Sequence, residues 1–283
     1  MRKAHIAGVD GSESALAAVR WAAVDAVLHR VPLRLICVGP DSLPDQIGAG
    51  DDTDRAGWLS TATQIATDAA PGVETISEFR RGVPHAVLVE ESERARRVVV
   101  GIRGLGERTG LPVGSTAETV AMHARCPVVV VRGRAPEPAE TSPIVVGVDG
   151  SRVSEAAVAE AFAEAAVRRV PLVAVHVWID VGIEPWLPLD DDRDWASIDE
   201  TERSVLAQRL AGWQEKYPDV EVRRVVERDR PVRYLQVHGE QAQLIVVGSR
   251  GRGGMTGMLL GSTSRALLHM APCPVLIARP NPR

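Results

Sequence analysis

Residues 98–131 read VVVGIRGLGERTGLPVGSTAETVAMHARCPVVVV, and residues 245–278 read IVVGSRGRGGMTGMLLGSTSRALLHMAPCPVLIA. Both stretches carry the pattern Gly-x2-Gly-x9-Gly-Ser at the same spacing. In each, a β-branched run leads into the first glycine, and the final Gly-Ser opens a helix-like stretch before a second β-branched run. A strand, glycine loop, helix and strand that recur at a fixed offset predict two copies of one domain.

The first part of each copy repeats as well. Gly-Val-Asp-Gly-Ser stands at 8–12 and again at 147–151, and Val-Pro-Leu follows at 31–33 and at 170–172. This offset is smaller by eight residues than the offset of the glycine loops, so we assign an insertion to the acidic, tryptophan-bearing stretch 178–195. A proline-rich segment without large apolar residues separates the copies. We therefore predict a first domain at 1–133, a linker at 134–143 and a second domain at 144–283.

Short β-branched runs alternate with longer helical patterns within each copy, which predicts an α/β fold. Because the strands are continuous apolar runs, we expect a parallel sheet covered by helices on both faces. Five strands are predicted in each copy, so the fold class is two tandem doubly wound domains. The predicted strands are Ile6–Val9, Leu33–Val38, Val73–Phe79, Val98–Val100 and Pro127–Val131, then Ile144–Val148, Leu172–Val177, Val220–Val226, Leu244–Val247 and Pro274–Ala278. Ser12 and Ser151 are the expected N-caps of the first helix of each copy.

Composition excludes several classes of protein. The chain has 283 residues, is 45% hydrophobic and 25% charged, and has a net charge of -4 without basic clusters. We expect neither a nucleic-acid surface nor a membrane segment. Cys37, Cys126 and Cys273 are too few and uneven for a disulfide framework, which favours a reducing compartment. An N-terminus without a signal-peptide pattern adds to the expectation of a cytoplasmic protein.

The glycine loops are the strongest candidate site. Glycines let backbone N–H groups approach phosphate oxygens, and a Gly-Ser at a helix start adds unpaired N–H groups and the helix dipole. Glycines that only form tight turns are the alternative, and two copies at one spacing favour binding. The pattern is neither a P-loop nor a dinucleotide fingerprint. The candidate residues are Gly101, Arg103, Gly104, Gly114, Ser115 and Thr116, and Gly248, Ser249, Arg250, Gly251, Arg252, Gly253, Gly261, Ser262 and Thr263.

A second candidate element follows the first strand of each copy. Gly8 and Gly147 lie within strands, where a glycine often marks the close approach of a ligand. Asp10 and Asp149 stand at the strand ends, where ligands of doubly wound folds bind. Each aspartate could accept from a nucleoside or orient a metal ion, and capping of the next helix is the alternative.

These residues resemble the ATP-binding members of the universal stress protein family over nearly the whole chain. The resemblance rests on the two glycine patterns, on Val-Asp-Gly-Ser, and on a second strand that ends His176-Val177, with Cys37-Val38 in the first copy. It implies a sheet order of 3-2-1-4-5, with Val38 and Val177 against adenine. It also implies association through the fifth strands, ATP with Mg²⁺, and a role in stress response or growth control.

The first copy departs from the family pattern. Ile102, Glu107 and Pro112 stand where the second loop has Ser249, Gly254 and Leu259. A carboxylate beside phosphates is unfavourable unless Arg103 or Arg108 pairs with it. If one site is weak, we therefore expect it to be the first.

Other residues have simpler interpretations. His123 and His269 near the cysteines do not align between copies, and a structural zinc site needs four ligands, so we predict no metal site there. The run Asp190–Asp192 is interpreted as a solvated loop. Trp178, Trp186 and Trp195 could form a lid or a partner surface, but packing of the insertion is favoured.

Three functions remain open from the sequence. The leading hypothesis is an ATP-binding regulatory protein without assigned catalytic residues, with little or no hydrolysis, a homodimeric state and an unidentified protein partner. The second is a slow ATPase or nucleotidyl-transfer enzyme in which the two aspartates hold a metal or water. The third is a nucleotide-free, dimerising scaffold.

Overall fold

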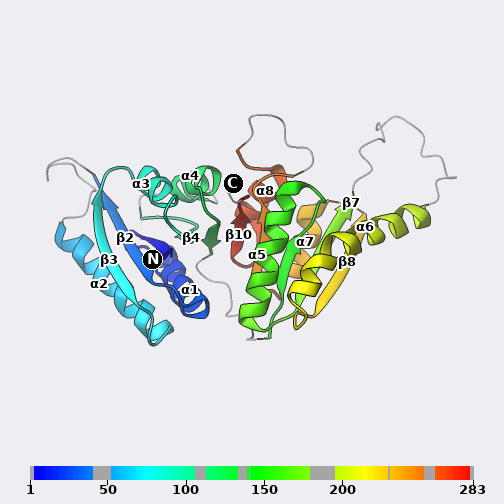
Figure 1. The fold of residues 1–283 in the computed structure, drawn as a ribbon. Helices are drawn as coiled ribbons and strands as arrows, with labels where there is room; N and C mark the ends of the chain where they lie inside the picture. The colour runs from blue at the N-terminus through cyan, green and yellow to red at the C-terminus, as the bar shows by residue number, and fades with distance from the viewer. Residues whose placement is uncertain are drawn as a thin grey trace, which may run out of the picture.

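The computed structural model describes residues 3–40, 52–105, 113–132, 139, 141–178, 195–228, 230–251 and 259–280, and Figure 1 shows its two halves side by side. The strands of the two halves are β1 His5–Val9, β2 Leu33–Gly39, β3 Thr75–Arg81, β4 Arg97–Gly101 and β5 Val128–Val131, then β6 Ile144–Gly147, β7 Leu172–Trp178, β8 Val222–Arg228, β9 Leu244–Gly248 and β10 Val275–Ala278. The helices are α1 Glu13–His29, α2 Asp52–Ala69, α3 Pro84–Glu91 and α4 Ser115–His123, then α5 Arg152–Arg168, α6 Trp195–Lys216, α7 Pro231–Gly239 and α8 Ser262–Met270.

All ten strands form one sheet in the order β3-β2-β1-β4-β5-β10-β9-β6-β7-β8. Within each half every pairing is parallel and the order is 3-2-1-4-5, which confirms the predicted fold class. The third strand of each half starts two residues later than the sequence predicts and runs two residues further, because its ladder to the second strand continues to Arg81 and Arg228.

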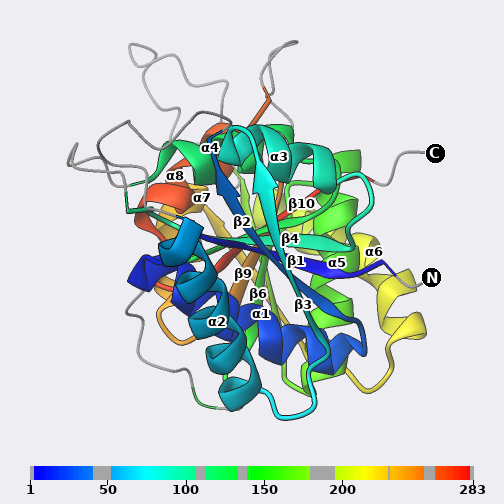
Figure 2. The same cartoon turned by 90° about the vertical axis from the view of Figure 1, so that its left-hand side faces the viewer.

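Helices cover both faces of the sheet (Figure 2). One apolar layer lies under α1, α2, α5 and α6, and the other under α3, α4, α7 and α8. The central strands contribute to both layers, which is why their sequences are nearly continuous runs of valine, isoleucine and leucine. No helix in the described part of the chain has the length and apolarity to cross a membrane.

The turn after the first strand is built alike in both halves. Ser12 and Ser151 accept from backbone N–H groups three residues on, as expected for N-caps. Gly11 and Gly150 precede them with φ of 81° and 74°, a backbone region that side chains disfavour. The Asp-Gly-Ser sequence therefore sets a tight turn at the carboxyl end of the strand.

The two halves meet through their fifth strands. β5 pairs antiparallel with β10, with Val129 opposite Leu276. This is the intramolecular pairing that the family resemblance implies. Because β5 also pairs with β4 and β10 with β9, both edges of each fifth strand are used within the chain. A second copy of the protein would have to bind another surface.

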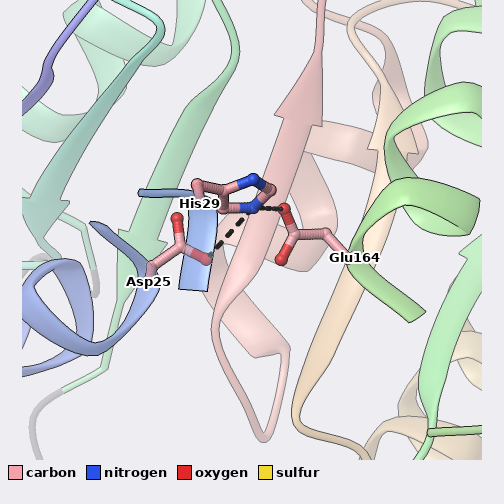
Figure 3. Close-up of side chains that lie close together, drawn as sticks. All are labelled: Asp25, His29 and Glu164. Atoms are coloured by element: carbon pink, nitrogen blue, oxygen red, sulfur yellow. Dashed lines mark hydrogen bonds and ion pairs between the residues drawn. The ribbon is translucent and has the colours of Figure 1, made fainter. Parts of the chain in front are cut away.

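A buried charge cluster also joins the halves, across α1 and α5. Asp25 and His29 come from α1 and Glu164 from α5, and Figure 3 shows them converging. Arg97, which is 1% exposed, lies 2.5 Å from Asp25 and 2.7 Å from Glu164. Arg168 lies 2.6 Å from Asp25 and 3.0 Å from Glu164.

The two arginines determine what this cluster does. Asp25, His29 and Glu164 have ligand atoms close enough for a metal ion. However, Arg97 and Arg168 already hold both carboxylates, and their positive charges oppose a cation. Burial acts to raise the pKa of Glu164, but Arg97, then His29 and Arg168, hold it well below its usual value. The ion pairs of Arg97 with Glu164 and of Arg168 with Asp25 therefore join the two halves.

His5 packs against this buried charge cluster, and its burial makes the free energy of unfolding depend on pH. Burial, with Arg97 and His29 nearby, lowers the pKa of His5 from 6.5 to about 2. In the unfolded chain His5 takes up a proton below pH 6.5, whereas in the folded chain it stays neutral, so acid favours unfolding. When the pH falls from 6.5 to 5, the free energy of unfolding of the wild-type protein should decrease by about 1.5 kcal/mol more than that of a His5→Phe variant. Urea unfolding at both pH values measures this difference, and equal losses would contradict it.

Candidate nucleotide-binding sites

Each half has a cavity at the carboxyl ends of its parallel strands. The cavity of the first half, of about 460 Å³, is lined by Asp10, Val38 and the glycine loop that begins at Gly101. The cavity of the second half, of about 390 Å³, is lined by Asp149, Val177 and the equivalent loop. The sequence places both elements at the switch point of the sheet, and the structure brings them together there.

The N-termini of α4 and α8 face these cavities. Each is preceded by a glycine N-cap, Gly114 or Gly261, and no described side chain caps it. This contrasts with α1 and α5, which Ser12 and Ser151 cap. The first residues of α4 and α8 line the cavities, including Thr116 and Thr263. Uncapped N–H groups at a cavity, together with the helix dipole, form a binding site for an anion.

A backbone hydrogen bond closes each glycine loop. The N–H of Gly114 donates to the carbonyl of Ile102 at 2.7 Å, and the N–H of Gly261 donates to Ser249 at the same distance. Ser249 is 2% exposed and is not among the residues that line the cavity. The Ile102 and Ser249 difference therefore lies at a buried position, although Ile102 does line the first cavity, and the loop is closed alike in both halves.

Asp10 connects the first strand to the first glycine loop. Its Oδ1 accepts from the N–H of Ser12 at 3.0 Å, and its Oδ2 accepts from the N–H of Leu105 at 3.1 Å. A side chain at Gly104 would collide with the same carboxylate. Glycine is thus needed at position 104 because the loop backbone lies against Asp10.

The second half repeats this arrangement. Asp149 accepts from the N–H of Ser151 at 2.8 Å. An ideal Cβ on Gly251 would stand 2.5 Å from its Oδ2. Each aspartate therefore orders the turn before a helix and packs against the glycine loop beside the cavity, while a role toward a nucleoside or metal ion stays a prediction.

The other predicted residues take different places. Arg103 and Arg250 line the cavity mouths and are exposed. Gly8 and Gly147 line the cavities, and a Cβ on either would also press on a leucine of α3 or α7. Several predictions lie outside the described residues: Arg252 and Gly253 in the second loop, Glu107, Arg108 and Pro112 in the first, and Trp186 and Asp190–Asp192 in the insertion.

The three cysteines are free thiols and are buried. Burial raises the pKa of Cys37 to about 11, and those of Cys126 and Cys273 to about 12. They are therefore protonated packing residues rather than thiolate ligands.

The sequence predicts the second helix of each half, at 54–70 and 198–217, but it assigns no site residue to either helix. Arg55 and Trp58 of α2 line the first cavity, and Glu202 of α6 lines the second beside Trp178. Neither helix carries a motif, and the face it turns to the cavity is set by packing. The internal repeat is the sequence signal that could have pointed to these residues. At the offset of the glycine loops it aligns Arg55 of the first half with Glu202 of the second.

Comparison with known proteins agrees with this geometry. The model of the universal stress protein family matches residues 1–132 and again 140–279. The chain belongs to the universal stress protein family. A universal stress protein of Mycobacterium tuberculosis is 41% identical over 288 residues, which cover 97% of this chain and 95% of the relative. One from Mycolicibacterium smegmatis is 42% identical, covering 97% and 96%.

The fold of this universal stress protein also matches a solved structure. A universal stress protein from Archaeoglobus fulgidus superposes with a TM-score of 0.68 at 20% identity, covering 98% of both chains. At that identity the likeness concerns the fold alone, and it extends over both halves.

Proposed function

We propose that this universal stress protein binds ATP in both cavities and acts as a regulatory protein in stress response or growth control. The observation that carries the proposal is the pair of helix N-termini at the cavities, which no described side chain caps, each beside a closed glycine loop. Such N–H groups favour phosphate oxygens. Arg103 and Arg250 add positive charge at the cavity mouths. Val38 and Val177 line the same cavities, and the family resemblance assigns adenine to this position.

Mg²⁺ would enter with the ATP phosphates. Asp10 already accepts from backbone N–H groups on both carboxylate oxygens, so it is a poor sole ligand for the ion. Phosphate oxygens and water would therefore supply most of the coordination, as Mg²⁺ prefers. The serine and threonine hydroxyls at the starts of α4 and α8 are the protein groups best placed to add to it.

Hydrolysis should be slow. The carboxylates at the loops, Asp10 and Asp149, are engaged in ordering turns. Glu202 is engaged with His176 at 2.8 Å. A general base must instead be free to reach the attacking water. A regulator whose loops are ordered by bound ATP is thus favoured over an ATPase, and bound nucleotide would change the surface offered to a partner.

Calorimetry tests the proposal directly. Nucleotide-free protein titrated with ATP and Mg²⁺ should show two binding events per chain, and nucleotide extracted after incubation should still be ATP. Binding of neither ATP nor other nucleotides would overturn the proposal. Fast release of phosphate would instead favour the enzyme.

A further inference from the structure

The helices α2 and α6 present opposite charges at the same place in the two cavities. The same backbone hydrogen bond closes the turn after each helix, and its donor is Val73 in one half and Val220 in the other. Arg55 and Glu202 both stand 18 residues before that donor, so they are equivalent. Both line their cavities.

The strands beside these helices differ in a matching way. β2 ends on Gly39, whereas β7 ends on Trp178. An ideal Cβ on Gly39 would lie 2.8 Å from Nε of Arg55, so the guanidinium fills space that a side chain at this position would need. Cζ of the same guanidinium lies 5.5 Å from the ring centroid of Phe79. The missing side chain at Gly39 thus makes room for the guanidinium of Arg55 at the first cavity.

The second cavity has a carboxylate instead. Glu202 is 22% exposed, and its Oε2 lies 2.8 Å from Nε2 of His176. Nδ1 of His176 lies 2.7 Å from the carbonyl of Val148, which can only accept, so Nδ1 carries a proton. The contact with Nε2 holds the Glu202 carboxylate at the cavity wall. In the first half Cys37 replaces the histidine, so the two cavities differ at this position of the second strand as well.

Both charges lie away from the anion-binding end. In the sheet β2 and β4 lie on opposite sides of β1, and β7 and β9 lie on opposite sides of β6. The glycine loops therefore lie on one side of each cavity, and the carboxyl end of β2 or β7 lies on the other. A nucleotide with its 5′-phosphates at the loops places its nucleoside near Arg55 or Glu202. In related sheet folds a carboxylate at this edge accepts from ribose hydroxyls, whereas an arginine accommodates a phosphate on the ribose. Arginine suits phosphate because its fork of donors can bind two oxygens at once.

We infer that the two cavities select different adenine nucleotides, an inference that rests on the proposed nucleotide binding. The second cavity selects a nucleotide with free ribose hydroxyls, through Glu202. The first selects one with an additional phosphate on the 2′ or 3′ position of the ribose, through Arg55. ATP then binds in both cavities, and a nucleotide with the additional phosphate competes with it in the first cavity alone.

The test compares three probes in chains with a single working cavity. Gly251→Ala leaves the first cavity and Gly104→Ala leaves the second, and each chain is titrated with AMP, adenosine 2′,5′-bisphosphate and adenosine 3′,5′-bisphosphate. In the first cavity one bisphosphate should bind about tenfold to a hundredfold more tightly than AMP. In the second, both bisphosphates should bind about tenfold more weakly than AMP, because Glu202 repels the added phosphate.

Matched substitutions separate the ribose end from the loop. Arg55→Met should remove the preference for bisphosphate and leave AMP binding in place, whereas Arg55→Lys should keep part of it. Arg103→Met, at the loop, should weaken all three probes alike. Equal binding of the three probes in both cavities would overturn the inference while leaving the proposed function intact. Failure of ATP and all three probes to bind the unaltered protein would overturn both.

Discussion

The Arg97→Met variant is expected to lose about 3 kcal/mol of its free energy of unfolding. Arg97 is buried between the halves and pairs with Asp25, Glu164 and the more exposed Glu160. Removing one partner of a buried ion pair leaves the other charges without compensation, which typically costs about 3–5 kcal/mol. The lower end applies because Arg168 still holds both buried carboxylates.

Urea unfolding followed by circular dichroism measures this loss. Arg203→Met is the matched control, since Arg203 makes an exposed pair with Asp199 within α6 at 2.8 Å. The same substitution there should cost no more than about 0.5 kcal/mol, as exposed helix pairs contribute little. Equal losses in the two variants would mean that the buried cluster contributes no more to the free energy of unfolding than an exposed ion pair does.

The Gly251→Ala variant is expected to lose ATP binding in the second cavity, with affinity reduced about tenfold to a hundredfold. The new Cβ would stand 2.5 Å from the Asp149 carboxylate, so the loop or the aspartate must move. Either movement displaces the backbone N–H groups that would face phosphate. Gly104→Ala should do the same in the first cavity through Asp10. Calorimetry of each variant should show one remaining site.

Two glycines on helices supply the controls. An ideal Cβ on Gly57 in α2, or on Gly212 in α6, meets no atom within 4 Å. Alanine there should leave both sites intact and raise the free energy of unfolding by about 0.5–1 kcal/mol, because glycine is a poor helix former. Loss of binding in Gly212→Ala, or normal two-site binding in Gly251→Ala, would contradict the role given to the loop.

Much of the fold could be predicted because it follows from local patterns. Apolar runs such as 98–100 and 244–247 specify buried parallel strands. Ser12 and Ser151 cap their helices through backbone N–H groups only three residues further along the chain. Position along the chain also placed the glycine loops and the two aspartates at strand ends, where the structure has them. The start of β3 was misplaced because the strand boundary depends on pairing with β2, which the sequence of β3 does not encode.

The sequence by itself determined that this protein is a tandem repeat with one glycine loop per copy. Spacing within a segment is a local property, and a repeat makes it visible twice. Only the tertiary structure decided which distant side chains share a cavity or a junction. Arg55 and Glu202 reach their cavities, and Arg97 reaches Asp25 and Glu164, because packing orients helices that carry no motif. The glycines set where phosphate can lie, and the packed helices set the charge that faces the rest of the ligand.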